Sequence, residues 1–459
     1  MTEILRHPAS FKDPSGHVFT VDGIYYRQIN QSYAKEYDYL INSGLYQSLV
    51  EKKLLLGHKE LNNPVNDSTD YYKTLLPEQL PFISYPYEWS FDQLKDAALL
   101  TLRVARIALK KDMMLKDATP FNIQFYNGSP VFIDTLSFEK CDFGKPWIAY
   151  RQFCETFLFP LLLEHYLKID VQKWLSVYLE GIPVKTTAAL LPIRSRLNLG
   201  VWLNVYLQNN IQSNGSPGSL KSNYHKDKML RLLEHLTSII KKININTALR
   251  STWNNYYDET ILSQDYLKAK EKIFRVMISD IRDCRVLDLG CNDGYFSKVI
   301  AEGNNRVISA DFDSQCINRF YNQLKTEKRG DILPLCIDIS NPPPATGFRN
   351  TERQSFIERI PSDAVAVLAL IHHLVLSKNI LLADVARLFS ELTKKWLIIE
   401  FVPLQDEKAQ QLVANKSSFH EPYDIPSFKE FFLAYFEIEK EVTIPGTERV
   451  LFKMRKRSF

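Results

Sequence analysis

The sequence predicts an α/β protein in two parts, with a doubly wound parallel sheet in the C-terminal half and an α+β domain in the N-terminal half. A chain of 459 residues exceeds what one hydrophobic core usually organises. Continuous apolar runs alternate with helical patterns in the C-terminal half. Residues 208–228 are rich in Gly, Ser, Asn and Pro. We therefore expect domains at 1–207 and 229–459, joined by a linker at 208–228.

Five apolar runs are the expected strands of the C-terminal sheet, because strands covered on both faces are apolar throughout. The runs are RVLDLG, RVISAD, LPLCID, AVAVLAL and WLIIEF. Apolar residues three and four apart predict two amphipathic helices before the first strand, over residues 229–242 and 265–281. Strands and helices in this alternation indicate a doubly wound sheet.

The N-terminal half has a different pattern. The run HVFTVDGIYYRQI predicts a β-hairpin that turns at Asp22 and Gly23, since Asp-Gly favours tight hairpin turns. Helices are expected over residues 33–53 and 91–111, and residues 122–136 predict a second hairpin.

Charge, cysteine content and apolar stretches give no indication of several classes of protein. With 57 basic and 53 acidic residues, the formal net charge is +4, which gives no strong indication of nucleic-acid binding. The six cysteines lack the Cys/His spacing of a zinc site, so no metal site is expected from them. No signal peptide and no apolar stretch of membrane-spanning length is found, which predicts a cytoplasmic protein without a membrane segment.

The segment VLDLGCNDGYFS, residues 286–297, predicts a strand that enters a glycine turn and then a helix. Gly290 and Gly294 would let the backbone pass close to a ligand. Asp288, Asp311 and Asp338 lie at or near the ends of three successive expected strands, where ligands bind in such sheets. A carboxylate after the second strand can accept hydrogen bonds from ribose hydroxyls. The other reading, in which these acids only cap helices, stays open.

The pattern Asp-x-Gly-x-Asn-x-Gly in this segment resembles the first motif of class I S-adenosylmethionine (SAM)-dependent methyltransferases, with Asn292 where a glycine is common. The resemblance implies a Rossmann-like methyltransferase fold and SAM as cofactor. It places Asp288 near the methionine part of SAM, Asp311 at the ribose and Asp338 at the adenine amino group. A third acid favours SAM over a dinucleotide, because no pyrophosphate needs room. The cofactor-binding residues it implies are Asp288, Gly290, Cys291, Asn292, Gly294, Asp311, Phe312 and Asp338.

His372 and His373 follow the fourth expected strand and are the candidate catalytic residues. Methyl transfer mainly needs alignment of the acceptor, and a histidine can take the proton of a hydroxyl or ammonium acceptor. The alternative is that both histidines pack or cap the next helix. Glu400, at the end of the fifth strand, and Tyr266 and Lys270, in the helix before the first strand, are further residues that could reach the site.

In the N-terminal half, Asp117, Asn122 and Asp134 resemble the catalytic loop and metal-binding aspartate of the protein-kinase and aminoglycoside-kinase fold, which would imply ATP and Mg²⁺. Three features depart from that pattern: the glycine-rich loop is missing, Leu115 replaces the usual histidine, and Arg27 stands where a lysine is usual. We therefore expect a kinase-like shape that serves recognition or regulation. The alternative is that Asp117 and Asn122 only order a loop.

Taken whole, the chain resembles a bacterial family of SAM-dependent methyltransferases that includes nodulation or host-specificity proteins. The resemblance rests on SYPYEWSFDQLKDAALLTL, LKDATPFNIQF, VFIDTLSFE, VLDLGCNDGYFS, LALIHHL and IIEFVP. It implies methyl transfer to an unidentified acceptor, such as a glycan, a lipid or a small molecule. Two alternatives are a bifunctional protein that also binds ATP, and a protein that binds SAM without turning it over.

Overall fold

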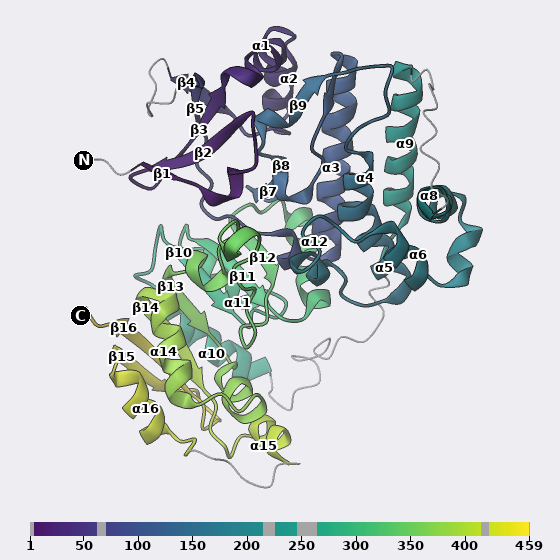
Figure 1. The fold of residues 1–459 in the computed structure, drawn as a ribbon. Helices are drawn as coiled ribbons and strands as arrows, with labels where there is room; N and C mark the ends of the chain where they lie inside the picture. The colour runs from purple at the N-terminus through teal and green to yellow at the C-terminus, as the bar shows by residue number, and fades with distance from the viewer. Residues whose placement is uncertain (1–3, 62–69, 214–224, 246–263, 415–421, 459) are drawn as a thin grey trace. The chain divides into compact units, whose positions relative to one another are not determined.

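The computed structural model describes residues 4–61, 70–213, 225–245, 264–414 and 422–458, and Figure 1 shows its ribbon. Contacts divide the chain into two compact units. The first holds residues 1–246 and 345–354, and the second holds residues 247–344 and 355–459. This division lies beyond the expected linker, because the helix α9 (Lys226–Lys242) packs against α3 (Phe91–Lys110) of the first unit. Most of the expected linker, and residues 251–263 before the methyltransferase-like motif, lie outside the described residues.

The first unit contains a five-stranded antiparallel sheet, ordered β1-β2-β3-β5-β4, and two small two-stranded sheets, β6-β9 and β7-β8. Both expected hairpins are present. The first turns at Asp22 and Gly23, which have φ values of 50° and 78°, and the second turns at Asn127 and Gly128. The strands are β1 (Ile4–Arg6), β2 (Gly16–Val21), β3 (Ile24–Asn30), β4 (His58–Leu61), β5 (Tyr71–Pro77), β6 (Met113–Leu115), β7 (Ile123–Tyr126), β8 (Ser129–Phe132) and β9 (Phe138–Lys140).

In the first unit, α2, α5 and α9 pack against α3, whose expected start and end are confirmed within one residue. The helix expected over 33–53 is divided in two, because Gly44 has a φ of 73° that an α-helix does not allow. The α-helices are α1 (Ala34–Asn42), α2 (Leu45–Glu51), α3, α4 (Tyr150–Phe153), α5 (Phe159–Leu167), α6 (Val184–Leu190), α7 (Leu199–Val201), α8 (Leu207–Ser213) and α9.

Residues 345–354 come from the C-terminal half of the sequence but belong to the first unit. There Phe348 stacks on Phe11, with ring centres 5.4 Å apart. The guanidinium of Arg353 lies 3.8 Å from the ring centre of Phe121. These contacts fix the segment to the first unit by aromatic and cation–π packing.

The second unit is built on a seven-stranded sheet ordered β12-β11-β10-β13-β14-β16-β15. The five strands expected from the sequence are parallel and have the order 3-2-1-4-5, so the doubly wound sheet is confirmed. Two further strands, β15 and β16, form an antiparallel extension that the sequence analysis missed. The strands are β10 (Arg285–Leu289), β11 (Arg306–Asp311), β12 (Ile332–Cys336), β13 (Ser362–Val367), β14 (Thr393–Phe401), β15 (Phe436–Thr443) and β16 (Val450–Lys456).

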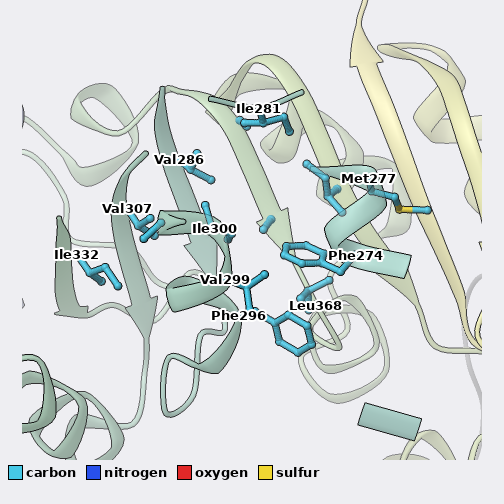
Figure 2. Close-up of a cluster of buried hydrophobic side chains, with 14 of the residues drawn as sticks. Phe274, Met277, Ile281, Val286, Phe296, Val299, Ile300, Val307, Ile332 and Leu368 are labelled. Carbon is cyan, nitrogen blue, oxygen red and sulfur yellow. The ribbon is translucent and has the colours of Figure 1, made fainter. Parts of the chain in front are cut away.

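Helices alternate with the parallel strands along the chain. A buried apolar cluster packs α10 and α11 against the sheet. Figure 2 shows Val286, Val307 and Ile332 from three neighbouring strands in this cluster. Phe274 and Phe296 meet edge to face with ring centres 5.1 Å apart, which joins α10 to α11. The α-helices are α10 (Gln264–Met277), α11 (Tyr295–Ala301), α12 (Ser314–Glu327), α13 (Phe356–Arg359), α14 (Leu382–Leu392), α15 (Glu407–Val413) and α16 (Ile425–Leu433).

Among the helices of the described residues, none combines the length and the apolar character needed to cross a membrane.

Candidate functional site

The glycine turn between β10 and α11 adopts a left-handed backbone at three residues. The φ values are 73° at Gly290, 49° at Asn292 and 79° at Gly294. Asparagine tolerates this conformation better than most residues, which explains why Asn292 can stand where a glycine is common. The turn is tied to the next strand, because the Gly290 N–H donates to the Ala310 carbonyl over 2.8 Å. The polypeptide therefore turns tightly at the carboxyl end of β10.

Glycine is required at positions 290 and 294 for different physical reasons. A Cβ at Gly294 would lie 2.0 Å from Cζ of Phe320, a buried ring on α12, so only glycine fits there. A Cβ at Gly290 would meet its nearest atom, in Leu370, at 3.5 Å, an ordinary contact. Gly294 therefore allows α11 and α12 to pack closely, whereas Gly290 is required for its backbone conformation.

Asp311 is the last residue of β11 and is bonded to the glycine turn. Its carboxylate accepts a hydrogen bond from the Asn292 N–H and another from the Asp313 N–H, each over 2.9 Å. Burial raises the pKa of Asp311 to about 6. Asp313 has a separate task, because it caps α12 by accepting from the N–H groups of Gln315 and Cys316.

Asp288 lies within β10 and is fully buried. The hydroxyl of Ser297 donates to its carboxylate over 2.6 Å, and Ser309 donates in turn to Ser297 over 2.8 Å. Burial raises the pKa of Asp288 to about 6, against the effect of the Ser297 hydrogen bond. From β10 the chain passes to β11 on one side, and it later returns to β13 on the other side of β10. The strand order therefore reverses at β10, so Asp288 stands at the topological switch point of the sheet.

The remaining expected cofactor residues have mixed surroundings. Asp338 lies two residues beyond the end of β12, is half-buried, and accepts hydrogen bonds from the N–H and the hydroxyl of Ser340. Cys291 is buried in a small cluster with Ile317 and Cys336, which is a packing role. Phe312, next to Asp311, is 47% exposed.

His372 and His373 follow β13 at the same edge of the sheet, with ring centres 4.2 Å apart. His372 is completely buried, and neither of its ring nitrogens has a hydrogen-bond partner among the described residues. Burial lowers the pKa of His372 well below its ordinary value and that of His373 to about 4, and the charge of Arg449 adds to both shifts. Both rings are therefore neutral at pH 7. A buried imidazole without a partner is costly, and such groups need an explanation.

A buried ion cluster lies beside these histidines, and it contains the other residues that the sequence indicated. Glu400, at the end of β14, accepts from the hydroxyl of Tyr266 over 2.8 Å and pairs with Lys270 over 2.5 Å. Burial alone would raise the pKa of Glu400, but Lys270 and Arg449 hold it below its ordinary value. We call Tyr266, Lys270, Glu400, Asp406 and Arg449 the buried ion cluster.

Arg449 and Asp406 complete this cluster and were missed by the sequence analysis. Arg449 donates through Nη1 to Tyr266 over 3.0 Å, and through Nε and Nη2 to Asp406 over 2.7 and 3.0 Å. Neither residue belongs to a motif, and they are distant in sequence from Tyr266, so no local pattern could have revealed them. Two cations and two carboxylates balance the charge of the cluster. Lys270 also lies 4.9 Å from the ring centre of Phe296, which connects the cluster to α11.

In the first unit, the three residues of the kinase-like pattern lie near one another. Asp134 pairs with Arg27 of β3 over 2.7 Å and accepts from the hydroxyl of Ser137. Asn122 donates to the same hydroxyl over 2.9 Å. Burial and the charge of Asp134 raise the pKa of Asp117. Within the described residues, no group of three or more His, Cys, Asp and Glu side chains is arranged to hold a metal ion.

The fold defines the class of protein: an α+β unit is followed in the sequence by a doubly wound α/β unit, with the buried Asp288 and Asp311 at its switch point. No protein-family model matches the chain. The chain is 30% identical to the nodulation protein NoeA of Rhizobium meliloti (strain 1021) over 462 aligned residues, which cover 98% of this chain and 96% of that protein. It therefore belongs to the NoeA family.

Solved structures resemble parts of the chain only distantly. The N-methyltransferase NodS of Bradyrhizobium japonicum WM9 has a TM-score of 0.32 and 11% identity, covering 43% of this chain and 99% of NodS. Magnesium protoporphyrin IX methyltransferase ChlM of Synechocystis PCC 6803, with SAH bound, has a TM-score of 0.32 and 12% identity, covering 45% and 92%. The bifunctional kinase-methyltransferase WbdD has a TM-score of 0.31 and 17% identity, covering 46% and 42%. Likeness of this degree carries no argument about activity.

Proposed function

We propose that the second unit binds SAM at the carboxyl edge of its sheet and transfers the methyl group to an acceptor. The observation that carries the proposal is the bonding of the Asp311 carboxylate to the glycine turn at Asn292, beside Asp288 at the switch point. This arrangement presents two carboxylates and a tight backbone turn to one ligand. A nucleoside with a positively charged substituent suits that set of groups.

The residues have distinct tasks in this proposal. The carboxylate of Asp311 accepts the backbone N–H groups of Asn292 and Asp313 and would also accept a hydrogen bond from a ribose hydroxyl. Asp338 would accept from the adenine amino group. The negative charge of Asp288 would favour the cationic methionine end. The full proposed set is Asp288, Gly290, Cys291, Asn292, Gly294, Asp311, Phe312 and Asp338.

For the acceptor, we propose that His372 and His373 bind and orient the nucleophile. SAM supplies a methyl group that is already activated, so the protein has mainly to align the acceptor and receive its proton. Neutral imidazoles with lowered pKa values can accept a hydrogen bond from a hydroxyl acceptor at pH 7, although they are weaker bases than an exposed histidine. The buried nitrogens of His372 would gain a partner when the acceptor or an ordered water molecule binds.

The decisive experiment is calorimetric titration of the full-length protein with SAM. Asp311→Ala should weaken binding by about 10- to 150-fold, since hydrogen bonds to a charged group contribute ~1.5–3 kcal/mol. Asp313→Ala is the matched control, because Asp313 caps α12 and its loss should reduce stability while leaving affinity nearly unchanged. No binding of SAM at millimolar concentration would refute the proposal, and equal losses in both variants would refute the role of Asp311.

Turnover is tested with methyl-labelled SAM and cell extracts separated into glycan, lipid, protein and small-molecule fractions. Label in one fraction, with release of S-adenosylhomocysteine, identifies the acceptor class. Tight SAM binding without label or product would favour the non-catalytic SAM-binding alternative. A His372→Asn variant should bind SAM like the wild type but lose turnover if His372 serves the acceptor.

For the first unit, we propose a recognition or regulatory role with a kinase-like shape and without phosphoryl transfer. The supporting contact is the ion pair of Arg27 with Asp134. Asp134 stands where a kinase has its metal-binding aspartate, and here its carboxylate pairs with an arginine of the protein. The test combines labelled ATP, Mg²⁺ and cell extract with the wild type and with Asp117→Ala. Label transfer by the wild type alone would make the protein bifunctional.

A further inference from the structure

Residues Leu190–Trp202 of the first unit, between α6 and α8 (Figure 1), expose a run of large apolar side chains. Ile193 is 80% exposed, Leu197 91% and Leu199 68%, and Trp202 at the end of the run is 41% exposed. Single exposed apolar residues are common on protein surfaces. In contrast, a larger group of exposed apolar side chains indicates a surface that binds a protein, a membrane or a ligand. We call Ile193, Leu197, Leu199 and Trp202 the exposed apolar run.

The local structure turns the apolar residues outward and the small ones inward. Ser195 is completely buried, and its hydroxyl shares a hydrogen bond of 2.7 Å with Tyr206. Gly200 is so close to α9 that a Cβ would lie 2.7 Å from Ile239. Core packing thus holds the segment through a serine and a glycine, so the exposed apolar side chains contribute little to folding.

The backbone of the segment is also fixed. Leu191 takes an extended conformation before Pro192, which ends α6, and residues Ile193–Leu197 form the 3-10 helix η8. Asn198 then caps α7 by accepting from the Gly200 N–H over 3.0 Å. The exposed apolar run is therefore presented on an ordered scaffold.

The charged residues within this stretch of the sequence are all basic. No acidic residue stands between Glu180 and Asp227. Arg194 and Arg196 are exposed within the run. Arg194 donates to the Tyr166 carbonyl, and the guanidinium of Arg196 lies 4.9 Å from the ring centre of Tyr206. The two arginines therefore stand next to Ile193 and Leu197 in the sequence, each held by a contact with the first unit.

We propose that this surface docks the protein on an anionic lipid surface. Leucine, isoleucine and tryptophan enter the boundary between head groups and acyl chains, and neighbouring arginines pair with anionic head groups. The exposed Arg194 and Arg196 match an anionic surface, and a partly exposed tryptophan suits the polar–apolar boundary. The inference goes beyond the proposed methyl transfer and does not depend on it.

The test is co-sedimentation of the full-length protein with vesicles of phosphatidylcholine alone or with phosphatidylglycerol added. The wild type should bind the anionic vesicles more tightly, and added salt should weaken binding because surface charges are screened. The double variant Leu197→Ser/Leu199→Ser should lose at least roughly tenfold in partitioning, from the apolar area that is no longer buried. Arg196→Gln should reduce binding to the anionic vesicles only.

Ile24→Ser, at an exposed apolar position of the first hairpin, is the matched control and should bind like the wild type. Circular dichroism and urea unfolding of the double variant report whether the chain is folded as in the wild type. Failure to bind either vesicle, or equal binding by the double variant, would overturn the proposal. Self-association that only the double variant loses, without vesicle binding, would assign the surface to a second copy of the chain and also overturn it.

Discussion

Replacing Gly294 with alanine tests how the glycine turn is built. The residue has a φ of 79°, which costs an alanine ~1–2 kcal/mol. The new Cβ would also lie 2.0, 2.2 and 2.3 Å from three atoms of the Phe320 ring. Phe320 is 1% exposed and surrounded by the core of the second unit, so moving it costs a further ~1–3 kcal/mol. We expect Gly294→Ala to destabilise the second unit by about 2–5 kcal/mol.

Gly290→Ala is the matched control, because its φ of 73° is similar but its Cβ would meet only Leu370, at 3.5 Å. Its cost should be limited to the backbone contribution, ~1–2 kcal/mol. Urea unfolding followed by circular dichroism measures both variants. In a Phe320→Leu background, Gly294→Ala should cost about 1–3 kcal/mol less, since the overlapping ring is gone. Equal costs for the two glycine variants, or an unchanged cost in the Phe320→Leu background, would refute this account of the turn.

Two further predictions concern buried charges. Glu400→Gln should destabilise the second unit by ~3–5 kcal/mol, because Lys270 and Arg449 lose a buried counter-ion. The control is Glu391→Gln at the exposed pair with Arg387, which should cost less than ~1 kcal/mol. Urea unfolding compares the two variants, and similar costs would contradict the role given to burial. Burial raises the pKa of Asp288 to about 6 from about 3.9 in an unfolded chain, so its stabilising contribution is complete below pH 4 and is lost as the pH rises through 6. Relative to the wild type, Asp288→Asn should therefore gain up to ~3 kcal/mol of stability between pH 4 and pH 7, and a pH-independent difference would show that Asp288 titrates normally.

The parallel core of the second unit was predictable because its strands are apolar throughout and its turn residues are local. Asp22-Gly23 likewise predicted the first hairpin turn from two adjacent residues. Strand β15 was missed because charged residues stand at exposed positions along Phe436–Thr443, and β16 was missed because the buried Lys453 interrupts its apolar run. In the sheet, β16 pairs with β14 and β15 pairs with β16, and no local pattern encodes these pairings.

The candidate site shows the same division between local and distant information. The acids Asp288 and Asp311 were predictable from motif and strand ends, and the structure connects Asp311 to the turn. The buried ion cluster was only partly predictable, because Arg449 meets Tyr266 from a position far along the chain. The amphipathic pattern of helix α9 fits either unit, and only its packing against α3 places it in the first.

The segment 345–354 limits where the chain can be divided into fragments. It leaves the second unit after Pro344 and returns at Ser355, so its contacts with Phe11 and Phe121 belong to the first unit. A fragment that stops at residue 246 would lack Phe348 and Arg353 and would expose the aromatic surfaces they cover. A cut at residue 246 would therefore take from the first unit a segment that packs on it, and would leave that segment without its partners on the fragment that holds the second unit.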